Sequence, residues 1–406
     1  MCSPSLGYYI LPWTVCIHIL ETTSKLCSRQ VGVCAVYSND ASTKSYYLHT
    51  TKPGGQKCDQ ETFQKQAFPK IGKADRHNIS HKPLKYRKVD MFGSIIMDRN
   101  SSLVIKEFIL RGIPHTEDLH FFFILIFFVI YIFTIAGNSM LIIAVKGTPA
   151  LHKSMYLFLT NLSFLDICLS SVTLPKLLSN FLSWKTIPFN ECVCQLYFFH
   201  FLASCECFLY TVMAYDRYVA ICQPLHYSRL MSWRICISLA CGCWTTGSLH
   251  SMTHTLLTFL LPYCGPNTID YFFCDIIPIL KLACTDTTIN KTVTLANIGA
   301  VALLCFIIIL TSYVHILAAI MKIKTVNARM KTFSTCASHV TAVMLFYVPC
   351  VFIYLRPYSG TSGDSFIAIF YTLLTPLLNP IIYSLRNKEV KVGLKEILRG
   401  HLFNSC

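Results

Sequence analysis

Charged residues are scarce in this sequence. They make up 14% of its 406 residues, whereas a soluble globular protein carries about 25%. The deficit begins near Phe121, where long apolar runs replace a polar and basic N-terminal stretch. The scarcity argues against a chain of two or three soluble domains, which the length alone would suggest, and it indicates a membrane protein in contact with the lipid bilayer.

The sequence also lacks the patterns of zinc and nucleic-acid sites. Its 21 cysteines include C-x-C pairs such as Cys241 and Cys243, but no second pair follows at the spacing of a zinc finger. The net charge is +15, yet most basic residues of the apolar region lie in short connections between hydrophobic runs. That position suits anchoring at a membrane surface. We therefore predict no nucleic-acid partner, no zinc site and no cofactor.

Seven segments are long and apolar enough to cross a membrane, for which about 20 residues are needed. They cover approximately residues 121–145, 155–178, 193–221, 235–261, 293–321, 333–355 and 366–385. The fourth is the weakest, because Thr, Ser and His dilute it. Residues 387–399 then carry the pattern of an amphipathic helix on the membrane surface. The sequence predicts an all-α bundle of seven transmembrane helices over residues 121–385, with this short helix in a tail of residues 386–406.

Basic residues are distributed unevenly between the two sets of alternate connections. One set, together with the C-terminal stretch, holds fourteen Lys and Arg residues and the other holds five. Cytoplasmic loops are enriched in these residues, so the first set is predicted to be cytoplasmic. The expectation is a multi-pass plasma-membrane protein with an extracellular N-terminus and a cytoplasmic C-terminus.

Four cysteines are expected to face the extracellular space. Cys264, Cys274 and Cys284 lie in the long connection of residues 262–292, and Cys192 lies at the outer end of the third span. In an oxidising compartment four cysteines allow two disulfides, with several pairings open.

The N-terminal residues 1–96 show no repeat and no sustained helical or strand period, and we expect them to be disordered. Two interpretations stay open: a genuine extension, or translation from a later methionine such as Met97, of which the second is favoured. Residues 97–120 would form an extracellular segment, in which the sequon Asn100-Ser101-Ser102 predicts glycosylation of Asn100.

Two acidic residues lie inside predicted spans. Asp166 falls in the second span and Glu206 in the third. A charge in the membrane is costly and usually functional. The two carboxyl groups are expected at similar depth, either as protonated structural groups or as the ligands of a Na⁺ ion. In the seventh span, Pro380 is expected to kink the helix beside the polar Asn379.

The cytoplasmic end of the third span reads MAYDRYVAIC, residues 213–222. Asp-Arg-Tyr at this place resembles the rhodopsin-like G-protein-coupled receptors, and the full run resembles the odorant receptors among them. Further matching stretches are LSFLD at 162–166, PLHY at 224–227, KTFSTCASH at 331–339, and residues 376–383 followed by Arg386-Asn387. The motifs occur in order over about residues 100–399, so the chain is identified as resembling an odorant receptor.

The resemblance implies a signalling mechanism. Asp216 would hold Arg217 at rest and release it toward a G protein on activation. The switch would also include Tyr218, Tyr313, Asn379, Pro380 and Tyr383. The implied disulfides are Cys192–Cys274 and Cys264–Cys284. The implied partners are a small volatile odorant and a heterotrimeric G protein of the olfactory stimulatory type, which raises cAMP.

The resemblance places the ligand between the third, fifth and sixth spans. Such a pocket needs apolar walls and one or two polar groups. Helical spacing puts the following residues near one face of the third and sixth spans: Phe199, His200, Ala203, Cys207, Tyr347, Cys350, Val351 and Tyr354. The plainer interpretation of each is interhelical core. His200 is the best polar candidate for ligand contact.

The sequence departs from the family at two motifs. Ser154-Met155-Tyr156 stands where Pro-Met-Tyr is usual, and Phe346-Tyr347-Val348 stands where Phe-Tyr-Gly is usual.

Other classes of membrane protein fit the sequence less well. A retinal pump needs a lysine in the last span, which residues 366–385 lack. A transporter would be expected to show internal repeats, and an enzyme needs a polar catalytic cluster. A receptor for a peptide is the weaker alternative.

Overall fold

The computed structural model describes residues 32–37, 46–50, 87–90, 105–113, 117–182, 184–264, 266–355, 362–386 and 389–393. The chain divides into two units, Met1–Lys106 and Glu107–Cys406. In the first unit, β1 (Gly32–Tyr37), β2 (Tyr46–Thr50) and β3 (Arg87–Asp90) form an antiparallel sheet in the order β2-β1-β3. The sequence had not suggested these strands. Most of residues 1–96 lie outside the described part, as does Asn100, so disorder and glycosylation stay predictions.

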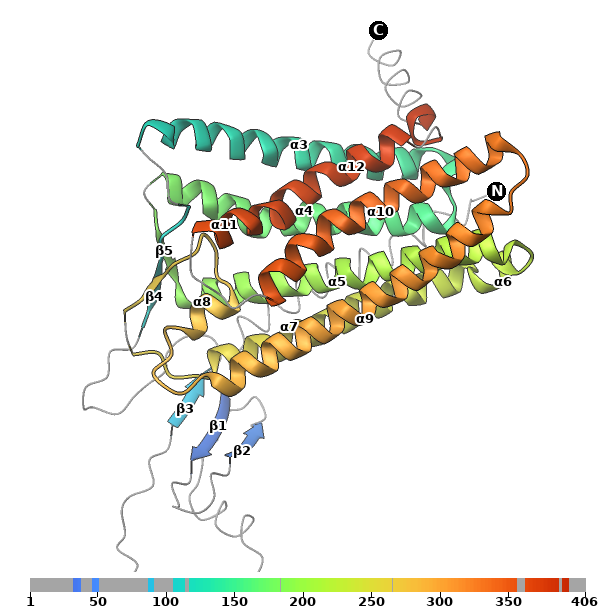
Figure 1. Ribbon diagram of the computed structural model, residues 1–406. Helices are drawn as coiled ribbons and strands as arrows, with labels where there is room; N and C mark the ends of the chain where they lie inside the picture. The colour runs from blue at the N-terminus through green and yellow to red at the C-terminus, as the bar shows by residue number, and fades with distance from the viewer. Residues whose placement is uncertain are drawn as a thin grey trace, which may run out of the picture. The chain divides into compact units, whose positions relative to one another are not determined.

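The second unit is a bundle of long helices (Figure 1). They are α3 (His120–Gly147), α4 (Ser154–Phe181), α5 (Phe189–Cys222), α7 (Trp233–Phe259), α9 (Thr288–Met321), α10 (Val326–Leu355) and a last span built from α11 (Ser362–Ile369), η4 (Phe370–Leu374) and α12 (Thr375–Arg386). All except α7 are apolar enough to cross a membrane by hydropathy. With α7, the span diluted by polar residues, the described helices give the predicted all-α bundle of seven spans.

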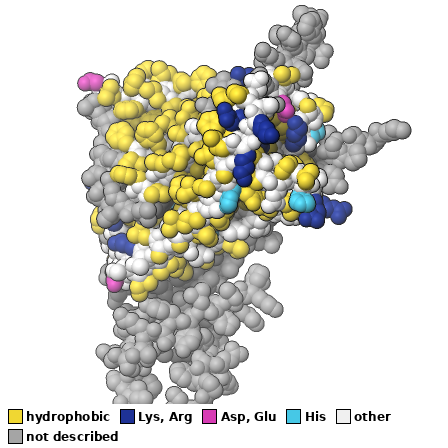
Figure 2. All heavy atoms as spheres, turned by 45° about the vertical axis from the view of Figure 1, so that its right-hand side comes forward, with side chains coloured by type: hydrophobic (Ala, Val, Ile, Leu, Met, Phe, Trp, Pro, Cys, Tyr) yellow, Lys and Arg dark blue, Asp and Glu magenta, His cyan; other side chains and the backbone are white. Residues whose placement is uncertain are grey.

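The apolar side chains of the bundle point outward as well as inward. In its most apolar stretch α3 buries only 11% of its residues and α9 22%, against 72% for α4 and 67% for α5. Apolar side chains cover the flank of the bundle in Figure 2, while most Lys and Arg side chains in that view gather at one end. An exposed apolar flank of this extent is suited to lipid, where helices satisfy their own backbone hydrogen bonds.

Close packing at α5 depends on a glycine. A Cβ added at Gly247 of α7 would lie 2.6 Å from the Cys205 sulfur and 3.1 Å from the Cys205 backbone nitrogen. The absence of a side chain therefore lets the backbones of α5 and α7 approach each other, as small residues do between membrane helices.

The last span is irregular at a place the sequence did not indicate. η4 is a turn of π-helix at Phe370–Leu374, ahead of the expected kink at Pro380. The Thr375 hydroxyl donates to the carbonyls of Phe370 and Leu345, at 3.2 and 3.3 Å. Pro380 itself packs against Gly137, where an added Cβ would lie 3.2 Å from the proline ring. Beyond α12, only residues 389–393 of the expected surface helix are described, and they are helical.

Short elements close the two ends of the bundle. At one end, β5 (Thr186–Pro188), β4 (Glu107–Leu110) and β6 (Thr268–Ile269) form a three-stranded sheet beside α8 (Ile276–Leu280), while η1 (Glu117–Leu119) leads into α3 (Figure 1). At the other end lie η2 (Pro149–Leu151), η3 (Pro224–His226) and α6 (Tyr227–Leu230). We call these the sheet end and the α6 end.

Candidate ligand and coupling sites

The charged pair at the α6 end joins a buried carboxylate loosely to a partly buried arginine. Asp216 is 1% exposed, and its Oδ2 lies 3.6 Å from Arg217 Nη2. Strong pairs of this kind are about 2.7–2.9 Å long. The other carboxylate oxygen has a closer partner, because the Tyr227 hydroxyl donates to Oδ1 at 2.9 Å. The Asp216 carboxylate is therefore shared between a cation on its own helix and a phenol from α6.

A small cavity of about 20 Å³ lies next to Arg217. It is lined by Met155, Leu159, Met213, Arg217, Thr335, Ser338, His339 and Tyr383, which come from α4, α5, α10 and α12. The volume is enough for about one water molecule. Arg217 thus borders a space at the junction of four helices, where a change in helix packing would alter its surroundings directly.

Three tyrosines predicted to belong to the switch lie around this region. The Tyr313 hydroxyl is 2.7 Å from His339 Nδ1. Tyr383 is buried on the cavity wall, and its hydroxyl has no hydrogen-bond partner within the described residues. Tyr218 and Tyr313 both pack against the apolar cluster of Ile316, Ile320 and Cys336. The structure therefore brings the predicted residues of this end together.

The middle of the bundle holds a polar network. Asn379 Nδ2 donates to both carboxylate oxygens of Asp166, each at 3.1 Å, and lies 3.0 Å from the Tyr210 hydroxyl. Glu206 is fully buried and interacts with Asp166. Asn138 ties α3 to the last span by donating to the Pro376 carbonyl at 2.9 Å. Two adjacent carboxyl groups away from water are not both charged unless a cation lies with them; otherwise at least one of them is protonated.

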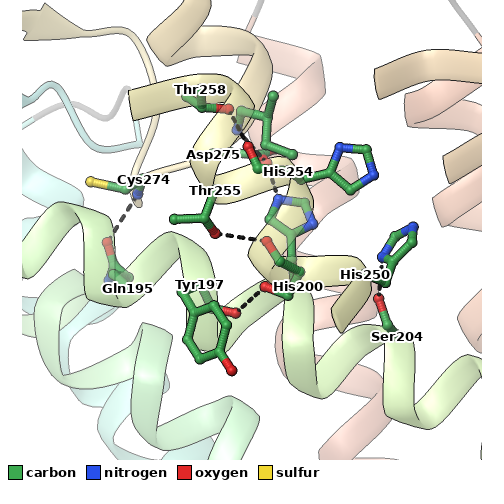
Figure 3. A network of polar contacts seen from close by, with 12 residues as sticks. Gln195, Tyr197, His200, Ser204, His250, His254, Thr255, Thr258, Cys274 and Asp275 are labelled. Carbon is green, nitrogen blue, oxygen red and sulfur yellow. Dashed lines mark hydrogen bonds and ion pairs between the residues drawn. The ribbon is translucent and has the colours of Figure 1, made fainter. Parts of the chain in front are cut away.

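At the sheet end, His200 has a partner that the sequence did not indicate. Its Nε2 lies 3.0 Å from Oδ1 of Asp275, and both side chains are 5% exposed (Figure 3). The same oxygen accepts from the Ile276 backbone nitrogen at 2.8 Å and so caps α8. Asp275 follows Cys274 directly in the chain, and that adjacency was the available signal. His200 is a hydrogen-bonded core residue that links α5 to the loop above it.

Most of the other predicted ligand residues lie at least partly inside the bundle. Phe199 packs against Phe273 of the loop with ring centroids 4.6 Å apart. The Cys207 sulfur and the Tyr347 hydroxyl are 3.1 Å apart. Ala203 and Cys350 are half-buried. Phe199, Cys207 and Tyr347 thus contact other elements of the bundle.

Val351 does not fit the predicted pocket face. It is 38% exposed, and it continues the exposed stripe of Met344 and Val348 along α10. The assignment fails because three- and four-residue spacing from Tyr347 allows two neighbouring positions, of which only one faces inward. The side chain of Tyr354 lies outside the described residues.

Comparison with known proteins decides the family. The family model described as "Olfactory receptor" matches residues 127–400. The chain belongs to the olfactory receptor family. Human olfactory receptor 10G2 is 53% identical over 306 residues, which cover 74% of this chain and 99% of the relative. Human 10G3 is 52% identical, covering 75% and 98%, and mouse 4E2 is 48% identical, covering 72% and 95%. The chain is an odorant receptor in a multi-pass membrane fold and not an enzyme.

Two disulfides hold the long loop of this olfactory receptor. Cys192 pairs with Cys274 at a Cα–Cα distance of 5.5 Å, and Cys264 pairs with Cys284 at 5.8 Å. The Cys274 backbone nitrogen also donates to the Gln195 side chain at 2.9 Å (Figure 3). The loop is thereby attached to α5 at Cys192 and Gln195 as well as at His200.

The receptor carries a further polar group that the sequence analysis did not single out. His250 Nδ1 lies 3.0 Å from the Ser204 hydroxyl, and His254 Nε2 lies 3.1 Å from Asn297 Oδ1. The two imidazole rings are 4.6 Å apart on α7 (Figure 3). Their spacing of four residues was a readable signal for one helix face. Among the described residues, no group of three His, Cys, Asp or Glu is arranged to hold a metal ion.

Proposed function

We propose that this olfactory receptor binds a small volatile odorant at the sheet end and activates a stimulatory, olfactory-type G protein at the α6 end, raising cAMP. The observation that carries the proposal is the state of Arg217. It is held at 3.6 Å by a carboxylate that Tyr227 also engages, and it borders a cavity between four helices. A weak contact of this kind can be exchanged for another when the helices move.

The orientation of the chain in the plasma membrane is part of the proposal. The α6 end carries most of the basic connections, which favours the cytoplasm. The sheet end carries both disulfides, which suits the oxidising extracellular side. An extracellular N-terminus, a cytoplasmic C-terminus and glycosylation at Asn100 follow from the same assignment.

The proposed ligand site is bounded by α5, α10 and the loop. Phe199, Ala203, Cys207, Tyr347 and Cys350 supply mostly apolar walls with a thiol and a phenol. His200 acts mainly through Asp275, because its Nε2 is already engaged. An odorant that displaces loop contacts near Phe273 would shift Asp275. Through the hydrogen bond between Asp275 and His200, that shift would also displace α5. This gives a route from ligand to helix that needs no direct hydrogen bond to His200.

The proposed switch runs along α5 to Arg217. Asp166, Glu206 and Asn379 form its middle section, and a Na⁺ ion shared by the two carboxylates would hold the resting arrangement. Rearrangement at Asn379 and Pro380 would move Tyr383 on the cavity wall. Arg217 would then leave Asp216 and face the G protein.

The test is cAMP accumulation in cells that express the chain with the olfactory G protein, across an odorant panel. Arg217→Ala should abolish the response while surface expression persists. Arg234→Ala is the matched control, since it removes an exposed arginine near the start of α7 at the same end. An odorant response that survives in Arg217→Ala would refute the proposed switch. Silence of the unmodified receptor at confirmed surface expression would refute the ligand class or the G protein.

A further inference from the structure

Ser154 is the first residue of α4 and departs from the proline usual in the family. Its side chain is buried at the α6 end, where its Oγ lies 3.2 Å from the Tyr227 hydroxyl and 3.5 Å from the Met231 carbonyl. A proline would suit the helix equally well, because the first helical residue has no intrahelical partner for its N–H. The serine therefore changes side-chain chemistry without being needed for the helix itself.

The protons at this site can be assigned. Tyr227 has one hydroxyl proton, and it goes to the Asp216 carboxylate at 2.9 Å, the only charged acceptor that the described residues offer to this hydroxyl. The Tyr227 oxygen is then left as an acceptor toward Ser154. The Ser154 proton goes to that oxygen at 3.2 Å in preference to the Met231 carbonyl at 3.5 Å. The result is a directed chain of hydrogen bonds, Ser154 to Tyr227 to Asp216, in which each bond polarises the next.

The Tyr227 hydroxyl keeps its proton and therefore always donates a hydrogen bond in this network. Burial, and then the nearby Asp216 charge, raise the pKa of Tyr227 to about 12. Its hydroxyl is therefore protonated throughout the physiological range.

We propose that Ser154 is a positioning residue for G-protein coupling. It orients the Tyr227 hydroxyl toward Asp216, so that the carboxylate is shared and Arg217 is held only loosely. The inference rests on the proposed role of Arg217. Removing the Ser154 hydroxyl frees Tyr227 to turn away, and both Asp216 oxygens then become available to Arg217. The tightened pair favours the resting state and lowers signalling without odorant.

The decisive comparison is Ser154→Thr against Ser154→Val. The two side chains have nearly the same shape and differ in the hydroxyl, so packing effects are matched. Basal cAMP per surface receptor should be about two- to twelve-fold lower in the Val variant, the effect of one neutral hydrogen bond. Ser154→Pro should behave like Val. In a Tyr227→Phe background the difference between Thr and Val should disappear. Equal basal signalling of Thr and Val, or a difference that persists with Phe at 227, would overturn the proposal.

A second measurement is independent of signalling. Hydrogen–deuterium exchange on the full chain in lipid nanodiscs reports the backbone around Tyr227. Residues 223–232 should exchange faster in the Val variant than in the Thr variant, and equal exchange would overturn the positioning role. If the unmodified receptor shows no basal cAMP above Arg217→Ala, the proposed coupling fails, while the exchange comparison still decides whether Ser154 positions this connection.

Discussion

The contact of α5 with α7 at Gly247 allows a quantitative prediction. Gly247→Ala would place a Cβ 2.6 Å from the Cys205 sulfur, 3.1 Å from the Cys205 backbone nitrogen and 3.2 Å from the Phe201 carbonyl oxygen. A change of side-chain rotamer can relieve only the first of these contacts. The other two involve backbone and require the helices to move apart. Overpacking of this kind costs about 1–3 kcal/mol.

Gly242 is the matched control on the same helix, because an added Cβ there meets nothing within 4 Å. Both substitutions gain about 1 kcal/mol of helix propensity, so the difference between them isolates packing. With an unfolding entropy of about 2.1 cal/mol/K per residue, the melting temperature of the unit Glu107–Cys406 shifts by about 1.6 °C per kcal/mol, so Gly247→Ala should melt about 2–5 °C below Gly242→Ala.

The assay is thermal unfolding of purified receptor, followed by fluorescence of a thiol-reactive dye, with surface expression as a second readout. Cys205→Ala combined with Gly247→Ala should recover part of the loss, because it removes the sulfur and leaves the backbone contacts. Equal melting temperatures for the Gly247 and Gly242 variants would refute the claim that this glycine sets the approach of α5 and α7.

Three further predictions concern the polar groups and the loop. Asp275→Ala should lower stability by about 1–3 kcal/mol, because the buried His200 Nε2 and the Ile276 backbone nitrogen lose their hydrogen-bond partner; melting of the purified receptor measures this, and a loss well under about 1 kcal/mol would contradict the pairing. Asp166→Asn should abolish any suppression of basal cAMP signalling by Na⁺ in membranes where sodium replaces an organic cation, and suppression that persists would argue against the sodium site. Cys284→Ser should cost about 3 kcal/mol, as expected for a disulfide closing a loop with a sequence separation of 20; Cys264→Ser should match it, and unequal losses would mean that the two cysteines do not act as a pair.

Much of the candidate site could be read from local sequence. Asp216 and Arg217 were identified by their motif, and Asp166, Glu206 and Asn379 by being polar within apolar spans. Partners from other segments could not be identified in this way. Tyr227 belonged to a recognised stretch, PLHY, but its bond to Asp216 depends on how α6 folds back. Asp275 lies in a loop, where no periodicity predicts the direction of a side chain.

What the sequence determined by itself is the set of spans and their order. A helix in lipid satisfies its own backbone hydrogen bonds, so about 20 apolar residues suffice to define it whatever its neighbours are. Even α7, diluted by polar residues, occupies its predicted place.

The tertiary structure decided which face of each helix points inward. Neighbouring residues on a helix differ by about 100°, so Val348 is exposed while Tyr347, the residue before it, is buried. In lipid both faces of a helix can be apolar, and hydrophobicity therefore does not distinguish them. The inward face is fixed by specific long-range contacts, such as the approach of Gly247 to Cys205 and the sharing of Asp216 by Arg217 and Tyr227.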